Sequence, residues 1–286
     1  MKPTKVILQR NDGRFSANDQ LDRVTAKPSS VLEFDAIGGG RTRSLGAAIT
    51  NFALLPAASV AAGTDALFLA TGTGTEVVAR ADKGGVNLKS QATTPADGDE
   101  VLLTPVTTTG VYCKVGAGKN PTFRARLALN TDTRSFYSTG LTELITDTDP
   151  SGTAGEGALF CFDPTGEFVN IANGAAANGS TNWYLWVKVN GVDYHCDTGV
   201  SVTAGKDYEL EVTLGDDYKP TFTIDGVDVT GGDDEWVAVA DGSAADNQAL
   251  TNGDTVAPFL GLELTASPLE QKHVDVRYIG LDRNIG

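Results

Sequence analysis

Hydrophobic and polar residues alternate along most of the chain after residue 100. The segment 207–215 shows this most clearly, because its apolar residues fall at every second position: Tyr208, Leu210, Val212 and Leu214. Successive side chains of a β-strand point to opposite faces, so a period of two predicts a strand with one buried face. The same alternation recurs in the segments 121–130, 181–196, 221–230, 257–264 and 273–281. The pattern predicts an all-β protein.

Two dipeptides between these segments predict tight hairpins. Asn190-Gly191 and Asp225-Gly226 each separate two apolar runs, and a two-residue type I′ turn requires the positive φ angles that Asn, Asp and Gly adopt most readily. Strands joined by hairpins without intervening helices specify stacked antiparallel sheets, so we expect an antiparallel β-sandwich.

The segment 45–62 departs from this pattern. Its apolar residues stand at roughly helical spacing, but Pro56 would end a helix there. We expect a short helix or an irregular strand in this part of the chain.

The N-terminal part differs from the remainder in apolar content and in charge. Residues 1–45 hold eight basic and five acidic side chains, a net charge of +3, and the chain total of −15 therefore leaves −18 for residues 46–286. The first segment has too few apolar residues to build a core. We expect an extended N-terminal arm over residues 1–45, with a hinge at the glycine run 38–40, and one sandwich domain over residues 46–286.

Charge and hydropathy also restrict the partners. A net charge of −15 argues against a nucleic-acid-binding body, which needs clustered Lys and Arg. No stretch approaches the ~20 apolar residues of a membrane span, and the N-terminus lacks the apolar run of a secretory signal. We therefore expect neither a nucleic-acid nor a membrane partner, and synthesis in a reducing cytoplasm.

Four segments, in this order, carry a resemblance to a known family: PTFRARLAL, FYSTGLTE, YELEVTLGDDYKPTFTIDGVDV and VAPFLGLELTASPLEQKHVDVRYIGL. They resemble the concanavalin-like or laminin-G-like jelly roll, over about residues 64–286. They also look like sandwich domains of tailed-phage structural proteins. The resemblance implies a concanavalin-like jelly roll in a virion protein, most simply a capsid decoration or cement protein on the head surface. It also implies self-association, as in a homotrimer.

On that reading the N-terminal arm binds the major capsid protein of a phage head. An extended arm can cover much partner surface and order on binding, and its basic residues complement an acidic partner. The residues assigned to this contact are Val6, Ile7, Leu8, Arg10, Arg14, Arg41 and Arg43.

Carbohydrate binding is the alternative function. Exposed aromatic rings stack on sugar rings, and the candidates for this role are Trp186, Tyr194 and Trp236. With them exposed on a concave face, the chain would be a carbohydrate-binding module of a tail fibre or spike that recognises a host glycan.

The sequence contains no recognisable set of catalytic residues, and we expect that the chain is not an enzyme. Glycoside hydrolases on this fold need two carboxylates facing one groove, about 5–5.5 Å apart for retention of configuration. Glu209 and Glu211 share one face of a predicted strand, but no aromatic residues for sugar subsites are interleaved with them. We interpret both as solvated strand residues.

The cysteines and histidines of the sequence predict neither a disulfide nor a metal site. Cys113, Cys161 and Cys196 are an odd number without paired spacing, and we expect buried free thiols. His195 and Cys196 are adjacent on a strand and point to opposite faces, which argues against joint coordination. We predict no cofactor and no metal site. A structural calcium stays open as an alternative, because many acidic residues fall in predicted turns, namely Asp147, Asp149, Asp163, Asp216, Asp217, Asp233 and Asp234.

Overall fold

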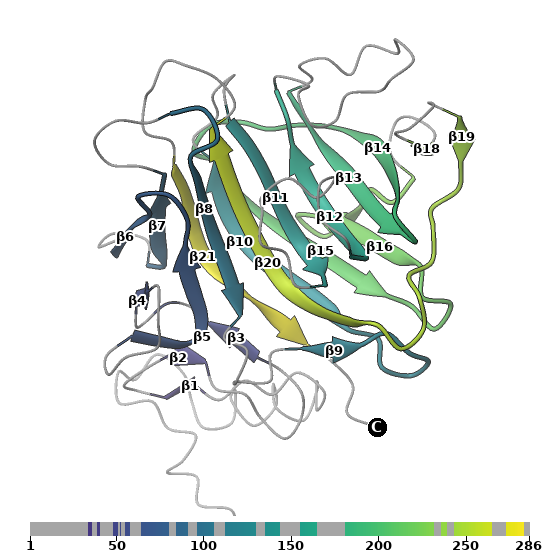
Figure 1. The fold of residues 1–286 in the computed structure, drawn as a ribbon, viewed down its shortest axis with the longest axis horizontal. Coiled ribbons are helices and arrows are strands. Elements are labelled where there is room, and N and C mark those ends of the chain that lie inside the picture. The colour runs from purple at the N-terminus through teal and green to yellow at the C-terminus, as the bar shows by residue number, and fades with distance from the viewer. Residues whose placement is uncertain are drawn as a thin grey trace, which may run out of the picture.

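A computed structural model shows a β-sandwich (Figure 1). It describes residues 34–35, 39–40, 48–50, 52, 55–57, 64–79, 84–90, 96–105, 112–129, 135–143, 155–164, 181–231, 236–238, 243–264 and 273–282. Every regular element in these ranges is a β-strand, as the alternation predicts. No helix in the described ranges is long and apolar enough to cross a membrane.

The first layer, the back sheet, has eight strands. Its order is β17 (Val227–Asp228), β16 (Pro220–Ile224), β15 (Asp207–Leu214), β10 (Thr122–Leu129), β21 (His273–Asp282), β7 (Val86–Lys89) and β6 (Glu76–Ala79), with β3 (Ala48–Thr50) also paired to β21. All of these pairs are antiparallel.

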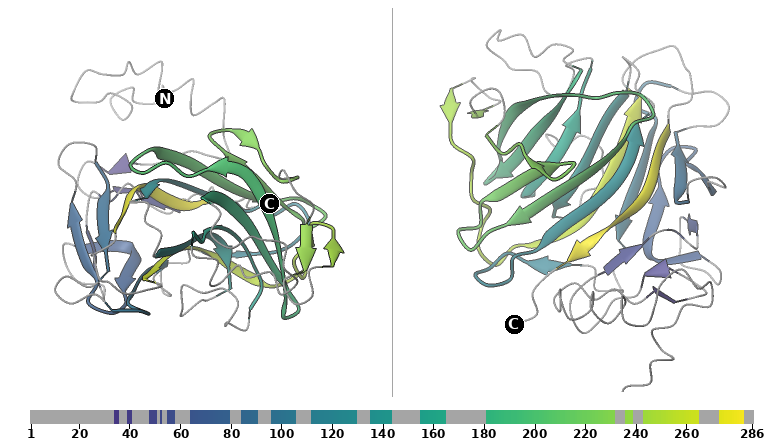
Figure 2. Two further views of the ribbon diagram at one scale, coloured as in Figure 1. Left: turned by 90° about the horizontal axis from the view of Figure 1, so that it is seen from above. Right: turned by 180° about the vertical axis from the view of Figure 1, so that it is seen from behind.

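The second layer, the front sheet, has eleven strands. Its order is β19 (Ala244–Ala245), β18 (Trp236–Ala238), β14 (Val192–Ser201), β13 (Asn182–Val189), β12 (Gly157–Phe162), β11 (Ser135–Thr142), β20 (Thr255–Leu264), β8 (Glu100–Pro105), β5 (Thr64–Thr71) and β4 (Leu55–Ala57), with β9 (Cys113–Lys114) paired to β20. Only β4 and β5 pair in parallel among its described strands. Seen from above, the two sheets are stacked as layers and curve together (Figure 2).

Both predicted hairpins form as type I′ turns. Asn190 and Gly191 have φ angles of 52° and 75°, and Asp225 and Gly226 have φ angles of 51° and 79°. These left-handed conformations favour Asn, Asp and Gly at such positions. The first turn joins β13 to β14, and the second joins β16 to β17.

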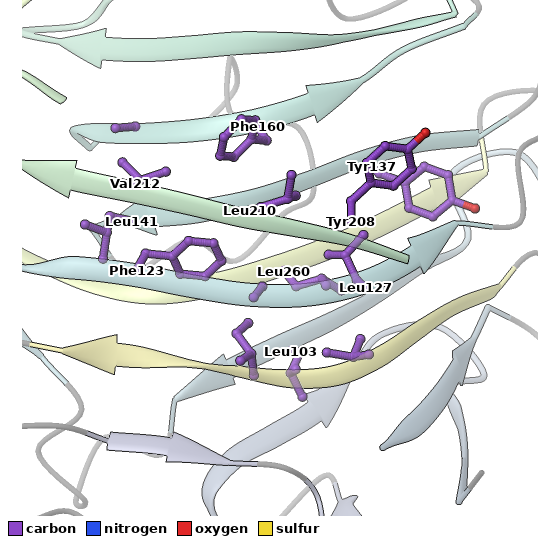
Figure 3. Packing of buried hydrophobic residues seen from close by; sticks show 14 of the residues in the cluster. Leu103, Phe123, Leu127, Tyr137, Leu141, Phe160, Tyr208, Leu210, Val212 and Leu260 are labelled. Atoms are coloured by element: carbon purple, nitrogen blue, oxygen red, sulfur yellow. The ribbon is translucent and has the colours of Figure 1, made fainter. Parts of the chain in front are cut away.

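The core lies between the two sheets and is rich in aromatic residues. Phe160 of the front sheet meets Phe222 of the back sheet edge-on, with ring centroids 5.3 Å apart, and Trp183 meets Tyr208 edge-on at 5.8 Å. Edge-to-face pairs of this kind add about 0.5–1.5 kcal/mol each beyond the burial of their area. Figure 3 shows how Phe160, Tyr208 and Phe123 gather with aliphatic neighbours between the sheets.

The two sheets differ in how their strands are buried. β15 alternates strictly, with Tyr208, Leu210, Val212 and Leu214 buried and the residues between them wholly or partly exposed. In β12 every residue is buried, and in β13 every residue except the two end ones is buried. The outer side of β15 is therefore solvated and the outer sides of β12 and β13 are covered, while β21 of the back sheet is also buried over most of its length.

Several expectations from the sequence can be compared with the structure outside the sandwich core. The segment 45–62 contributes the short strands β3 and β4, so the strand alternative holds and Pro56 lies within β4. Gly39 and Gly40 form β2, which pairs with β1 (Phe34–Asp35). The three cysteines are buried free thiols, as predicted.

Candidate functional site

The β13–β14 hairpin places a row of polar and aromatic residues on the outer face of the front sheet. Its two-residue turn sets the register, so Lys188 lies opposite Asp193, Trp186 opposite His195, and Tyr184 opposite Asp197. The apolar residues between them face the core. We call this set the hairpin site: Asn182, Tyr184, Trp186, Lys188, Asp193, His195 and Asp197.

Trp186 and Lys188 both direct polar groups at one carboxylate. The Trp186 Nε1–H donates to Asp193 Oδ1 at 3.1 Å, and Lys188 Nζ lies 3.7 Å from the same oxygen. The Trp186 and Lys188 side chains are buried and Asp193 is half-buried. One hydrogen bond and one ion pair on the same oxygen restrain the orientation of this carboxylate.

His195 is enclosed by aromatic rings. It stacks on Trp186 with ring centroids 6.5 Å apart and meets Tyr184 edge-on at 6.1 Å. Only 2% of its surface is exposed, and its Nδ1 atom has no hydrogen-bond partner among the residues that the structure describes. Burial lowers the pKa of His195 to about 4, against a smaller opposite effect of the Asp197 charge. The imidazole is therefore neutral at neutral pH.

Asn182 and Asp197 form the half-exposed part of the site. Asn182 Nδ2 donates to both carboxylate oxygens of Asp197, at 3.1 and 3.3 Å. The Gly199 N–H donates to Asp197 Oδ1 at 2.8 Å, and the Ser201 hydroxyl donates to Asn182 Oδ1 at 2.8 Å. This network fixes an amide and a carboxylate side by side at the edge of the buried aromatic layer.

A pair of carboxylates lies elsewhere on the same outer face. Glu263 of β20 is directly opposite Glu100 of β8, and their neighbours Leu262 and Val101 point into the core. Both glutamates are half-exposed. Directly opposed residues of an antiparallel pair have Cβ atoms about 4.5–5.5 Å apart. The front sheet therefore brings two carboxylates together from strands that are distant in the chain.

The three aromatic residues predicted to bind sugar do not form one platform. Trp186 is on the outer face but is fully buried, so it offers no ring face to a sugar. Tyr194 lies on the opposite side of the strand and packs against the core. Trp236 is 6% exposed in the core beside Phe222, and its Nε1–H donates to Thr230 O at 3.0 Å. The ring-stacking role predicted for these residues is corrected accordingly.

Glu209 and Glu211 lie on the outer face of the back sheet, as solvated strand residues. Glu211 pairs with Arg124 at 2.8 Å across the sheet. Burial raises the pKa of Tyr278 above its usual range, and its hydrogen bond to Glu209 acts in the same direction. Both glutamates thus belong to cross-strand pairs on the face away from the hairpin site.

Acidic turns supply no metal centre in the part of the chain that the structure describes, where no group of three or more His, Cys, Asp or Glu side chains could hold an ion. Asp216 Oδ1 accepts the Gly118 N–H, and Asp217 Oδ1 accepts the Lys219 N–H. Asp163 is buried. The other four acidic turn residues, Asp147, Asp149, Asp233 and Asp234, lie outside the described residues.

The residues assigned to capsid attachment also lie outside the described residues, namely Val6, Ile7, Leu8, Arg10, Arg14, Arg41 and Arg43. Their contact with a major capsid protein, location on a virion and assembly as a homotrimer stay predictions. Particle occupancy by the intact chain and by a chain lacking residues 1–40 would test the attachment.

Sequence reasoning missed most of the hairpin site, although a signal for it was present. Once Asn190-Gly191 is taken as a two-residue turn, counting outward pairs Lys188 with Asp193 and Trp186 with His195. No local signal pairs Glu100 with Glu263, because the two strands are far apart in the chain.

No family model matches the chain, and no curated protein matches it. Solved structures share its fold. A protein of unknown function from Shewanella oneidensis has a TM-score of 0.53 at 9% identity, over 99% of this chain and 97% of that one. A Bacteroides ovatus GH16 protein of a mixed-linkage glucan utilisation locus, solved in complex with a product, has a TM-score of 0.50 at 9% identity, over 82% and 98%. The fold is the concanavalin-like jelly roll, as the resemblance implied.

These comparisons correct the expectation that the chain is not an enzyme. The fold includes a glycoside hydrolase at a TM-score of 0.50. The expectation relied on finding no carboxylate pair along a single strand, but a sheet can assemble such a pair from two strands. Glu100 and Glu263 are placed in that way.

Proposed function

We propose that this protein binds carbohydrate through the half-exposed side of the hairpin site. The observation that carries the proposal is the Asn182–Asp197 pair, in which one amide and one carboxylate are held together by four hydrogen bonds. Sugar hydroxyls are both donors and acceptors, so a fixed amide beside a fixed carboxylate is suited to them. Groups oriented in advance lose little entropy when the ligand binds.

The buried layer beneath this pair supports the same function. Tyr184, Trp186 and His195 pack against one another and limit the movement of the strands that carry Asn182 and Asp197. The His195 Nδ1 atom is buried without a hydrogen-bond partner, and an unsatisfied buried polar group costs about 1–3 kcal/mol. Such costs are typical of functional sites. The Bacteroides ovatus GH16 protein, which was solved in complex with a product, adds an argument by analogy of fold.

A panel of immobilised oligosaccharides tests the proposal. Wild-type protein is expected to retain at least one glycan, and Asp197→Asn, which removes the charge but keeps the shape, is expected to bind that glycan at least about tenfold more weakly. Glu209→Gln makes the same chemical change on the back sheet and is the matched control. Equal retention by wild type and Asp197→Asn would contradict the assignment to this site.

A second candidate function, cleavage of a glycosidic bond, is favoured by one observation. Glu100 and Glu263 stand opposite each other on the outer face, with Cβ atoms about 4.5–5.5 Å apart as is general for such pairs. Two flexible carboxyl groups carried from that spacing can reach the separation of about 5–5.5 Å that the acid and the nucleophile of retaining glycosidases adopt. In that chemistry one carboxyl protonates the leaving oxygen while the other attacks the sugar carbon.

Product analysis tests this second function. Incubating a bound glycan with wild-type protein should release shorter oligosaccharides, and Glu100→Gln and Glu263→Gln should each abolish their release. Glu211→Gln, on the back sheet, is the control and should leave the release unchanged. Intact oligosaccharide after prolonged incubation with the wild type would exclude cleavage while leaving binding standing.

A further inference from the structure

The loop that joins β19 to β20, residues 246–254, runs along one edge of the sandwich and contacts both sheets (Figure 1); we call it the strap. On the side of the back sheet, Asn247 Nδ2 donates to Pro220 O at 2.6 Å, and the Leu250 N–H donates to Tyr218 O at 3.0 Å. The Leu250 side chain lies in the core between the sheets, with 2% of its surface exposed. The strap therefore covers part of the core as well as connecting two strands.

A buried carboxylate, that of Glu156, holds the strap to the front sheet at the start of β12. Its Oε1 accepts the Thr251 hydroxyl at 2.7 Å and the Asn190 N–H at 3.2 Å, and its Oε2 accepts the Thr251 N–H. Thr251 belongs to the strap, and Asn190 belongs to the turn between β13 and β14. One side chain thus joins three segments that are distant in the chain.

Two further carboxyl groups face Glu156. Glu143, which follows β11, accepts the Glu156 N–H on its Oε2 at 3.1 Å. Asp254, the last residue of the strap, forms a side-chain hydrogen bond with Glu156. Burial is the largest of the effects that raise the pKa of Asp254, followed by the charges of Glu156 and Glu143 and by that hydrogen bond. Because both partners of the bond are carboxyl groups, it forms only while one of them carries a proton.

The basic side chains of the adjacent strands β13 and β9 are directed elsewhere. Lys188 of β13 has its Nζ 3.7 Å from Asp193, and Lys114 of β9 is exposed to solvent. The charges that act on the Asp254 carboxyl are those of the two neighbouring glutamates. When Asp254 loses its proton, the end of the strap and the residue that holds it therefore carry like charges in contact.

We propose that the Asp254–Glu156 pair is a pH-sensitive closure of the strap. While the pair shares a proton, the bond between the two carboxyl groups and the donors of Thr251 hold residues 251–254 against the front sheet. When that proton is lost, repulsion between the two charges opens this end of the strap and uncovers the core beside Leu250. The closure does not depend on the proposed carbohydrate binding.

The direction of the pH dependence follows from the raised pKa of Asp254. The closed strap keeps the proton at pH values at which the open strap, with the ordinary pKa of 3.8, has released it. The closed form is therefore fully favoured below that ordinary value and loses this advantage as the pH rises through the raised pKa. His195 acts in the opposite direction, because its pKa is lowered.

Amide hydrogen exchange measured by NMR between pH 4 and pH 8 tests the closure. The Thr251 and Gly253 N–H groups, which donate to Glu156 and to Val115 O, report on the strap, and the Val229 N–H of the back sheet is the reference. After correction for intrinsic exchange, protection of the strap amides relative to the reference should fall as the pH rises. The fall should be about tenfold for each unit between the Asp254 pKa, measured by carboxyl ¹³C titration, and 3.8. Constant relative protection over this range would overturn the inference.

Two variants assign the effect to one carboxyl group. Asp254→Asn removes the charge and keeps a hydrogen-bond donor for Glu156 at every pH, so the strap amides should stay protected from pH 4 to pH 8. Asp228→Asn makes the same change at an exposed residue of β17 and is the matched control, which should keep the wild-type pH dependence. The inference fails if Asp254→Asn keeps that pH dependence, if its strap amides are unprotected throughout, or if Asp228→Asn abolishes the dependence.

Discussion

The two outer faces of the sandwich differ in how their polar residues are placed. On the back sheet, charged residues pair across strands; Arg124 and Glu211, 2.8 Å apart, are each about one-third exposed, whereas Arg277, which pairs with Asp207 at 2.9 Å, is buried. On the front sheet, Lys188 and His195 are buried. His195 lies against the rings of Trp186 and Tyr184, and Asp193 accepts the Trp186 indole N–H and pairs with Lys188. Solvated pairs contribute little to stability, whereas buried polar groups are costly when a partner is lost. What distinguishes the front sheet is the buried His195 within its aromatic layer, beside which the proposed binding site lies.

Removing the largest side chain of the hairpin site should give the largest effect. Trp186→Ala leaves a cavity between β13 and β14 and removes the ring against which His195 stacks, so the free energy of unfolding should fall by about 3–5 kcal/mol. Glu209→Ala on the back sheet should change it by no more than about 0.5 kcal/mol. Urea denaturation measures both, and similar values for the two variants would remove the distinction between the faces.

Acid should destabilise the front sheet through His195. Its pKa is about 4 in the folded protein and near 6.5 in the unfolded chain. The unfolded state therefore binds more protons between these values, and stability falls as the pH is lowered from 6.5 to 4. The contribution of this one group over that window is about 3 kcal/mol. His195→Gln should lose this part of the pH dependence, measured as the difference between the two stability profiles. Parallel profiles would contradict the burial of a neutral imidazole.

The two ion pairs offer the sharpest matched comparison at smaller magnitude. Asp193→Asn removes the Lys188–Asp193 ion pair at a buried ammonium group and should cost about 1–3 kcal/mol. Glu211→Gln breaks the pair with Arg124 in a partly exposed setting and should cost no more than about 1 kcal/mol. Thermal unfolding of the two variants at equal ionic strength measures both losses of stability. A larger loss for Glu211→Gln than for Asp193→Asn would contradict this prediction.

How much the sequence could predict differs between the same two faces. β15 has one solvated face, so its alternation identifies both the strand and its buried residues. In β13 both faces are buried, and alternation cannot tell which aromatic residue faces the core and which lies on the outer face. Trp236 belongs to a three-residue strand, which is too short to show a period, and its place beside Phe222 comes from tertiary packing alone.

The candidate sites also differ in how far the sequence could predict them. The Trp186–His195 pairing is local and can be counted from the turn at Asn190-Gly191. The Glu100–Glu263 pairing forms only because β8 pairs with β20, and that strand order depends on the fold of the whole front sheet. Burial of His195 likewise requires several strands, and single residues give no sign of it.

The central claim is that ligand binding occurs at the hairpin site, and the three tryptophan indole N–H signals test it most directly. Only Trp186 donates its Nε1–H to a residue of that site, Asp193, whereas Trp236 donates to Thr230 and Trp183 lies in the core. On titration of ¹⁵N-tryptophan-labelled protein with a glycan that it binds, the Trp186 indole signal, assigned with Trp186→Phe, should shift while the signals of Trp183 and Trp236 stay in place. A bound glycan that leaves the Trp186 signal unmoved, or that shifts Trp236 instead, would contradict the account.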